Sequence, residues 1–283
     1  MLKQSELQCF KWTGSKWLIV KDIIQFLPDA GRTYYEPFLG GGVLLLNSAP
    51  HFKKVIGGDL YRPLIDLWKL LRDNPRDVIE HYSNLWESLK FEVENIDVER
   101  DRGKNYPKLY YKCREKFNES GDPLLLLFLT KTCLNGVIRF SKSGKFNNSF
   151  HHGRLGQRPS AFSRCVNNAT KLIHNANFVS TDALDLVQDV KKGDFVFLDP
   201  PYLSSRNRYI ENYSINQLET LLEFLNSKSV KWICTYDSQN DVEINKELFK
   251  NRLESQKYQS RIRRVSGRGV VNTSESIYLN FDI

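Results

Sequence analysis

The sequence predicts an α/β fold in which a single sheet is interrupted by a helical insertion. Short apolar segments bounded by turn-forming residues, typical of buried strands, occur near both ends of the chain. Three consecutive glycines, Gly40–Gly42, separate the first of these segments from a helical pattern. Residues 74–170 are mostly helical in pattern and rich in Lys, Arg, Tyr and Phe. A chain of 283 residues is long enough for one large domain or for one domain with an insertion.

The first half of the sheet is predicted from a strand, a glycine turn, a helix and a second strand in succession. Tyr34–Phe38 is a short aromatic strand that enters the glycine run, and Val43–Leu46 begins the helix. Val55–Gly58 forms the next buried strand, which ends at Asp59, and Pro63–Leu71 is helical by its apolar spacing. This order, with an acidic residue after the second strand, is typical of the first half of a Rossmann-like unit.

Strand patterns return after the insertion, separated by helical segments. The predicted strands are Asn177–Ser180, Phe195–Leu198 and Lys231–Thr235; the predicted helix is Ile215–Leu225; and a C-terminal hairpin is predicted from Tyr258–Val265 and Ser276–Phe281. A long polar loop, 141–160, lies inside the insertion. We therefore assign residues 1–73 and 171–283 to one domain and residues 74–170 to a second, helical domain.

Positive charge is concentrated in two blocks that contain no acidic residue. Residues 131–164 hold seven Lys or Arg, and residues 255–274 hold five, in a chain whose net charge is +8. Two basic blocks on a mildly acidic body favour binding to a polyanion such as nucleic acid. Charge by itself leaves a second interpretation open, which is an ordinary solvated basic surface.

The sequence gives no indication of a membrane, an export signal or a metal. No run approaches the ~18 to 20 apolar residues that a membrane helix needs, and the N-terminus lacks the apolar core of a signal peptide. The five cysteines are scattered, without a CxxC pair or a nearby His at ligand spacing. We expect a cytoplasmic protein with reduced thiols and no metal site.

The most informative short motif is Asp199-Pro200-Pro201-Tyr202, which directly follows the apolar strand. Two prolines end a strand, because neither can donate to the ladder, and they hold the next backbone segment rigid. In an open α/β sheet, ligands bind at the carboxyl ends of the strands. The motif therefore indicates a binding or catalytic site; a strand-ending turn with a packed tyrosine is the alternative.

The groups in this motif suit chemistry on an exocyclic aromatic amine, which is a weak nucleophile because its lone pair is delocalised into the ring. Asp199 and the carbonyl of Pro200 can each accept one N–H, which favours a pyramidal nitrogen, and Tyr202 offers a face for stacking. Methyl transfer from a sulfonium to such a nitrogen is an in-line displacement that needs positioning and charge stabilisation rather than a metal. A base inside a duplex would have to be flipped out first.

Several motifs in one order resemble the Dam family of N6-adenine-specific DNA methyltransferases, in the alpha-group motif order. The motifs are Lys11–Lys16 (KWTGSK), Glu36–Gly42 (EPFLGGG), Asp59, Asn135–Phe140 (NGVIRF), Gly144–Asn147 (GKFN) and Asp199–Tyr202 (DPPY). The resemblance implies a Rossmann-like, S-adenosylmethionine-dependent methyltransferase sheet, domain 1–73 and 171–283, with a helical DNA target-recognition domain, 74–170. It implies an enzyme that transfers the methyl of S-adenosylmethionine to N6 of a flipped-out adenine in double-stranded DNA.

The resemblance also implies roles for individual residues. The glycine loop would let backbone approach the methionine part of the cofactor, and Asp59 would accept a ribose hydroxyl. Asp182 would contact the cofactor adenine, although a helix N-cap is an equally good interpretation. The implied catalytic residues are Asp199, Pro200, Pro201 and Tyr202; the implied cofactor-binding residues are Trp12, Thr13, Gly14, Lys16, Glu36, Pro37, Phe38, Gly40, Gly42, Asp59, Asp182 and Asp199.

DNA contacts are expected in the first basic block and at the N-terminal motif. Arg139 would read a guanine bidentately in the major groove, whereas Lys142, Lys145 and Arg154 would hold phosphates. Leu134 stands where close relatives often carry an aromatic wedge, and an apolar leucine can still intercalate. The implied DNA-binding residues are Lys11, Leu134, Asn135, Arg139, Lys142, Lys145 and Arg154. The change at Leu134 and the different loop at 148–158 leave the recognition sequence open.

Rival functions remain at this point. An RNA N6-adenine methyltransferase or a glutamine N5 methyltransferase could share the glycine loop, but these usually have Asn before Pro-Pro-Tyr and lack the insertion. A non-catalytic DNA-binding module would explain the basic blocks but not the glycine loop or the Asp199 motif. A role in restriction-modification would imply a cognate restriction endonuclease that acts on the same site, and activity on the nucleoid.

Overall fold

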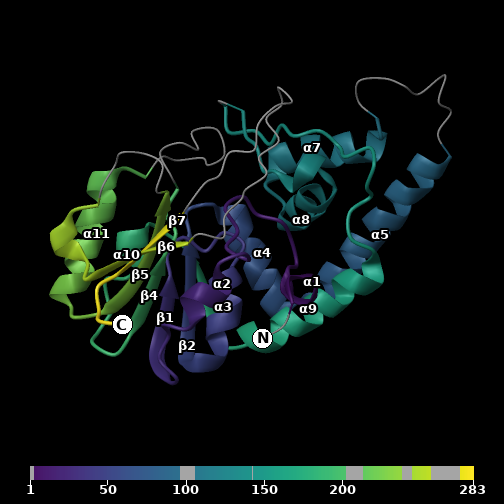
Figure 1. Cartoon of the computed structure of the whole chain (residues 1–283). Helices are drawn as coiled ribbons and strands as arrows, with labels where there is room; N and C mark the ends of the chain where they lie inside the picture. The colour runs from purple at the N-terminus through teal and green to yellow at the C-terminus, as the bar shows by residue number, and fades with distance from the viewer. Residues whose placement is uncertain (1–2, 96–105, 142, 202–212, 238–243, 256–274) are drawn as a thin grey trace. The chain divides into compact units, whose positions relative to one another are not determined.

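The computed structural model describes residues 3–95, 106–141, 143–201, 213–237, 244–255 and 275–283 (Figure 1). The chain forms two compact units. The first is made by the described residues of Met1–Ser15 and Tyr61–Ser180, and the second by those of Lys16–Leu60, Thr181–Arg206 and Glu211–Ile283. In the part of the chain that is described, no helix is long and apolar enough to cross a membrane.

The first unit is mostly helical. Its elements are α1 (Gln4–Leu7), α4 (Arg62–Asp73), α5 (Pro75–Glu94), α7 (Lys108–Ser120), α8 (Pro123–Thr132), the 3₁₀ turn η2 (Leu134–Gly136), α9 (Pro159–Ile173) and strand β3 (Ala176–Ser180). Proline occupies the first or second position of α4, α5, α8 and α9. There its missing N–H costs nothing, since the first turn of a helix has no acceptor for it.

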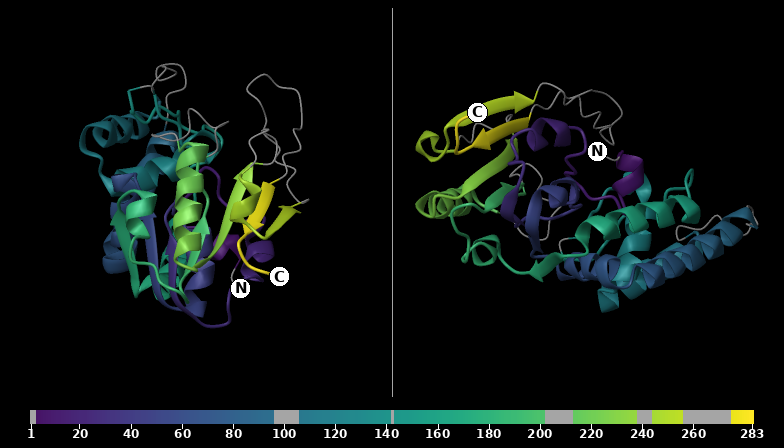
Figure 2. Two further views of the ribbon diagram at one scale, coloured as in Figure 1. Left: turned by 90° about the vertical axis from the view of Figure 1, so that its left-hand side faces the viewer. Right: turned by 90° about the horizontal axis from the view of Figure 1, so that it is seen from below.

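Helices α5 and α9 run side by side in this unit (Figure 2). The buried residues of α5 are Val78, Tyr82, Trp86 and Leu89, at intervals of three and four that place them on one face. Tyr82 packs against Phe162 of α9 with ring centroids 4.4 Å apart. Helix α8 is almost fully buried, as its run of leucines requires.

Six of the strands found in the described residues belong to the second unit. They are β1 (Gly31–Glu36), β2 (Phe52–Asp59), β4 (Phe195–Leu198), β5 (Lys231–Asp237), β6 (Asn251–Ser255) and β7 (Glu275–Leu279), which neighbour one another in the order β2-β1-β4-β5-β7-β6. Strands β2, β1, β4 and β5 are parallel, and β7 is antiparallel to both β5 and β6. The order reverses between β1 and β4, which is the switch point where ligands bind in such sheets.

Short helices and turns connect these strands. They are α2 (Val20–Ile24), α3 (Val43–Ser48), η1 (Ala49–His51), α10 (Ala183–Leu186), α11 (Ile215–Ser227) and η4 (Lys246–Leu248). Helix α11 begins with a capping box, in which Ser214 and Gln217 satisfy each other's backbone N–H groups. Its leucines form one core with Val196, Leu198 and Trp232 of the sheet.

The predicted α/β fold is confirmed, and β4 has the predicted bounds. Of the predicted C-terminal hairpin, the second strand corresponds to β7, which pairs with β6, Asn251–Ser255 (Figure 2). The predicted first strand, 258–265, lies outside the described residues. The compact units also divide the chain at different residues from the predicted domains. Residues 3–15, 61–73 and 171–180 belong to the helical unit, because α1 packs on α9 and α4 packs on α8, α9 and β3.

Candidate active site

Asp199 follows β4 directly, at the carboxyl edge of the parallel strands. Its Oδ2 lies 2.7 Å from the Nζ atom of Lys16, and the two side chains are 19% and 5% exposed. Its Oδ1 accepts a hydrogen bond of 3.0 Å from the hydroxyl of Thr235. The β4–β5 register pairs Leu198 with Cys234, so Thr235 stands beside Asp199 on the next strand. Two contacts therefore fix the carboxylate plane at the end of β4.

Glu36 ends β1 on the other side of the switch point and is fully buried. The hydroxyl of Tyr34 donates to its Oε2 at 2.8 Å. Burial raises the pKa of the Glu36 carboxyl well above its usual range, the Tyr34 hydrogen bond opposes that rise, and the nearby charge of Asp199 adds to it. Lys16 lowers the same pKa. The Lys16 ammonium thus pairs with Asp199 and offsets only a small part of the effect of burial on Glu36.

The glycine loop between β1 and α3 has the backbone that its sequence predicts. Gly40 has φ +46° and Gly42, the N-cap of α3, has φ +60°. Side chains rarely adopt this region, so glycine is required at both positions. The N–H of Gly40 donates to Oδ2 of Asp59 at 3.0 Å, and the N–H of Leu39 donates to the carbonyl of Gly58 at 2.8 Å. The loop is therefore tied to the end of β2.

Other predicted cofactor residues of the second unit lie on the same elements. Pro37 is buried, and Phe38 packs edge-on against Tyr213 with centroids 4.9 Å apart. Asp182 is the N-cap of α10 and accepts from the N–H of Leu184 at 2.8 Å. The N-cap that the sequence allowed is therefore present.

Three predicted cofactor residues belong to the first unit. Trp12 lies against Tyr61, with ring centroids 6.1 Å apart. The hydroxyl of Thr13 accepts from the N–H of Ile138 at 3.4 Å, and Gly14 has φ +81°. The N-terminal motif is thus packed on the segment that carries the predicted guanine-reading arginine.

That segment is stabilised by an antiparallel bridge between Phe140 and Phe146. Asn147 accepts from Nε of Arg139 through Oδ1 at 2.8 Å and from Nη2 through its carbonyl at 3.1 Å. These bonds use two of the five guanidinium N–H groups. The two Nη atoms therefore keep N–H groups that can make a second bidentate contact. Arg139 and Lys145 are exposed.

The remaining described DNA-binding candidates lie near the start of this segment or on the loop after it. Leu134 is an exposed large apolar side chain, and Asn135 has φ +58° within η2. Lys11 packs its stem close to Gly136, where an added Cβ would meet Lys11 Cδ. Arg154 is exposed and hydrogen-bonded to His151. Tyr202 and Lys142 lie outside the described residues.

Sequence reasoning missed two groups of the Asp199 site. Thr235 is inside an apolar strand and can be found only from the β4–β5 register. Tyr34 was predicted as part of a strand, and the spacing of Tyr34 and Glu36 by two was the available signal, since alternate residues share a face. Within the described ranges, no group of three or more His, Cys, Asp or Glu could hold a metal ion.

The chain is similar to several known proteins. The model of the family described as D12 class N6 adenine-specific DNA methyltransferase matches residues 12–266. Type II methyltransferase M.MjaIII of Methanocaldococcus jannaschii is 32% identical over 207 residues, 68% of each chain. DNA adenine methylase of Serratia marcescens is 27% identical over 276 residues, 94% of each chain. A solved structure, a putative methylase from Haemophilus influenzae, has a TM-score of 0.34 at 11% identity, covering 93% of this chain and 95% of that one.

Proposed function

The chain belongs to the family of D12 class N6 adenine-specific DNA methyltransferases, and from that premise we propose that Asp199 and the carbonyl of Pro200 hold the adenine N6 amino group for methyl transfer. The predicted activity, methylation of adenine in DNA, is confirmed by the family and by relatives named DNA adenine methylase. The RNA-methyltransferase and non-catalytic interpretations are therefore not favoured. The assignment of residues to the reaction is our proposal.

The observation that carries this proposal is the position of the Asp199 carboxylate. It stands at the carboxyl edge of β4 beside the switch point, with Lys16 on Oδ2 and Thr235 on Oδ1. Because both contacts are donors, they stabilise the charged carboxylate, which is the form that accepts an N–H from an amine. With Pro200 supplying a second acceptor, the amine lone pair is directed away from the ring. Pro201 holds this backbone rigid, and we propose Tyr202 as the stacking surface for the flipped base.

The methyl donor that we propose is S-adenosylmethionine, which supplies an electrophilic methyl group on a sulfonium when bound. Gly40 and Gly42 adopt positive φ values and carry no side chain, so a ligand can approach their backbone closely, which fits the methionine part of such a molecule. We place its ribose near Asp59 and its adenine near Asp182. The further residues proposed to contact it are Trp12, Thr13, Gly14, Lys16, Glu36, Pro37 and Phe38.

The second unit would then carry the chemistry, and the helical segment 74–170 would recognise the target. Lys11, Leu134, Asn135, Arg139, Lys142, Lys145 and Arg154 are the proposed DNA contacts. The relatives named type II methyltransferases favour a role beside a restriction endonuclease that acts on the same site. We place the protein in the cytoplasm, where the nucleoid is its substrate.

Incubating the purified chain with unmethylated duplex DNA and S-adenosylmethionine should produce N6-methyladenine and no methylcytosine. Digestion to nucleosides and mass spectrometry identifies the product, and sequencing DNA from a methylation-free host that expresses the chain gives the target. Methylated cytosine, or methyl transfer to RNA at the same rate as to DNA, would contradict the proposal.

Arg139→Ala and Lys145→Ala should have different effects, because one side chain is proposed to read a base and the other to hold a phosphate. A bidentate arginine–guanine contact contributes ~1–3 kcal/mol of discrimination, so Arg139→Ala should relax preference at one guanine position. Lys145→Ala should weaken cognate and non-cognate duplexes equally and lower the salt dependence by roughly one counterion.

The measurement is a salt series of dissociation constants on matched and singly substituted duplexes. Asn147→Ala serves as a control for orientation, since it keeps the arginine but removes its side-chain anchor. It should reproduce part of the loss of discrimination without changing the salt slope. Identical behaviour of Arg139→Ala and Lys145→Ala would mean that this basic block does not select the target.

A further inference from the structure

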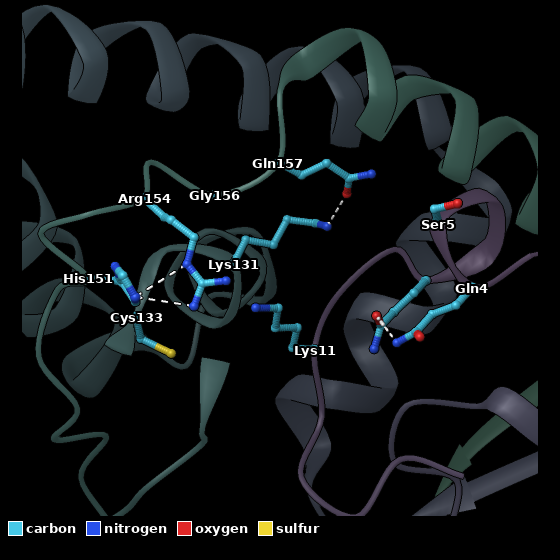
Figure 3. Close-up of a pocket in the computed structure, with 10 residues that line it drawn as sticks. Gln4, Ser5, Lys11, Lys131, Cys133, His151, Arg154, Gly156 and Gln157 are labelled. Atoms are coloured by element: carbon cyan, nitrogen blue, oxygen red, sulfur yellow. Dashed lines mark hydrogen bonds between the residues drawn. The ribbon is translucent and has the colours of Figure 1, made fainter. Parts of the chain in front are cut away.

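A basic pocket of about 250 Å³ lies within the first unit, and its lining includes none of the residues described at Asp199 (Figure 3). The N-terminal segment, the end of α8 and the loop 151–157 form it. Lys11, Lys131 and Arg154 all line it, and none of its lining residues in the described chain is acidic. In Figure 3 these three side chains lie next to one another. A pocket lined by three cations and no carboxylate is suited to an anion.

Lys131 is the unusual member, because it is a buried charge. It lies in the last turn of α8 and is 9% exposed. Its ammonium donates to the amide oxygen of Gln157 and lies 5.0 Å from the ring centroid of Phe162 and 5.9 Å from that of Tyr82. These partners are neutral. Burying a charge costs free energy unless an opposite charge compensates it. These partners hold the side chain in place, but none of them neutralises the ammonium.

The cations of the pocket also repel one another. Burial lowers the pKa of Lys131 to about 8, and the charge of Lys11 contributes to that shift. Burial likewise lowers the pKa of Lys11, with a further contribution from Arg154. An anion bound among them would reverse both effects, because an opposite charge within a few Å favours the protonated amine.

Arg154 has a poor hydrogen-bond partner in His151. The Nε2 atom of His151 faces Nε and Nη2 of Arg154 at 3.3 and 3.2 Å, while its Nδ1 accepts from the N–H of Gly153 at 3.1 Å. A neutral imidazole has one accepting nitrogen, so it cannot satisfy both sets of donors. The guanidinium therefore has N–H groups that a better acceptor would take.

Glycines allow the backbone to close around these cations. Gly136 has φ +64°, and a Cβ there would clash with Cδ of Lys11. Gly156 has φ +88°, and a Cβ there would lie 3.1 Å from the carbonyl of Lys131. Both positions thus need glycine for their backbone angle, and a side chain at either would crowd one of the lysines.

We propose that this pocket binds a phosphate group, held by Lys11, Lys131 and Arg154. Phosphate offers several acceptor oxygens and matches the fork of an arginine, whereas a lysine binds it as a point charge. The group can come from a phosphodiester of the DNA substrate or from inorganic phosphate. The DNA source rests on the proposed function; the inorganic source does not. Lys131 is then a DNA contact that the sequence did not single out.

The first test uses inorganic phosphate as the probe and thermal unfolding of the full chain as the readout. Millimolar phosphate should raise the unfolding temperature relative to chloride at equal ionic strength, because a ligand that binds the native state stabilises it. Lys131→Met should abolish that rise. Lys171→Met, which removes an exposed lysine of α9 in the same unit, should keep it. Arg154→Gln, a change at an exposed position that leaves the fold intact, should reduce the rise as well.

The second test measures duplex DNA affinity against salt. For a DNA phosphodiester in the pocket, Lys131→Met should weaken binding roughly tenfold and lower the slope of log K on log salt by about one. Loss of the phosphate effect with an unchanged slope would mean that the pocket takes inorganic phosphate. Wild-type behaviour of Lys131→Met in both tests would overturn the proposal. Both readouts measure binding, so they stand apart from any result on methyl transfer at Asp199.

A pH series adds a signature that a structural role for Lys131 would not produce. DNA affinity of the wild type should fall as pH rises from 7 to 9, since the free lysine loses its proton near pH 8 and binding must restore it. Lys131→Arg should show a flatter profile.

The titratable or charged groups that face Lys131 are Cys9, Lys11, Tyr82, His151, Arg154 and Cys165. Burial raises the pKa of Cys9 to about 12, so that thiol stays neutral between pH 7 and 9.

Discussion

Asp199→Asn should lower the rate of methyl transfer by about 10³-fold, while the affinity for S-adenosylmethionine changes little. The asparagine keeps the size of the side chain but replaces one accepting oxygen with a donor. It can no longer stabilise the amine nitrogen through a charged acceptor, and its amide N–H would oppose an N–H of the base or of Lys16. The measurement is single-turnover methylation of duplex DNA, with cofactor binding by calorimetry. Near-native turnover would exclude Asp199 as the group that holds N6.

The same substitution should also destabilise the protein, because it breaks the buried pair with Lys16 at 2.7 Å. Removing one partner of a buried ion pair costs about 3–5 kcal/mol, so loss of activity needs a control for folding. Combining Asp199→Asn with Lys16→Met removes both charges and should recover much of the free energy of unfolding. The double variant should remain inactive. Recovery of activity with stability would mean that Asp199 acts through folding alone.

The sequence predicted the part of the site that depends on local chain direction. Pro200 and Pro201 mark the end of β4, and the glycines mark the turn after β1, so Asp199 and the loop could be placed at the carboxyl edge of the sheet. Thr235 could not be placed there, because its contact with Asp199 depends on the register of β4 against β5. Local signals identify strand ends, whereas partners across strands require the sheet order.

The same distinction explains why strand β6 was not predicted. Strand β6, Asn251–Ser255, has the sequence NRLES and lacks the alternation of a typical strand. It is a strand because β7 pairs with it, Leu253 opposite Ile277. Tertiary pairing therefore overrides weak local preference. Lys131 was missed for a related reason: a lysine near a helix end is normally solvated, and only the packing of Tyr82 and Phe162 shows that this one is buried.

The glycine loop allows the cofactor proposal to be tested separately from catalysis. Gly40 has φ +46°, a region that a β-branched residue almost never adopts. Its N–H is also bonded to Asp59, the proposed ribose contact. A valine at this position would bring a side chain to the surface proposed to meet the methionine part of the cofactor. It would also pull the loop away from Asp59.

Gly40→Val should therefore raise the dissociation constant for S-adenosylmethionine by roughly 30-fold or more, equivalent to about 2 kcal/mol, while duplex DNA affinity stays within a few-fold of wild type. Gly193→Val is the matched control: Gly193 has φ +95° in the same unit, and a Cβ there meets nothing within 4 Å. It carries the same kind of backbone strain outside the loop, so it should lower stability without changing cofactor affinity. Calorimetry on both folded variants makes the comparison. Equal cofactor affinity in Gly40→Val and Gly193→Val would place the cofactor away from the glycine loop.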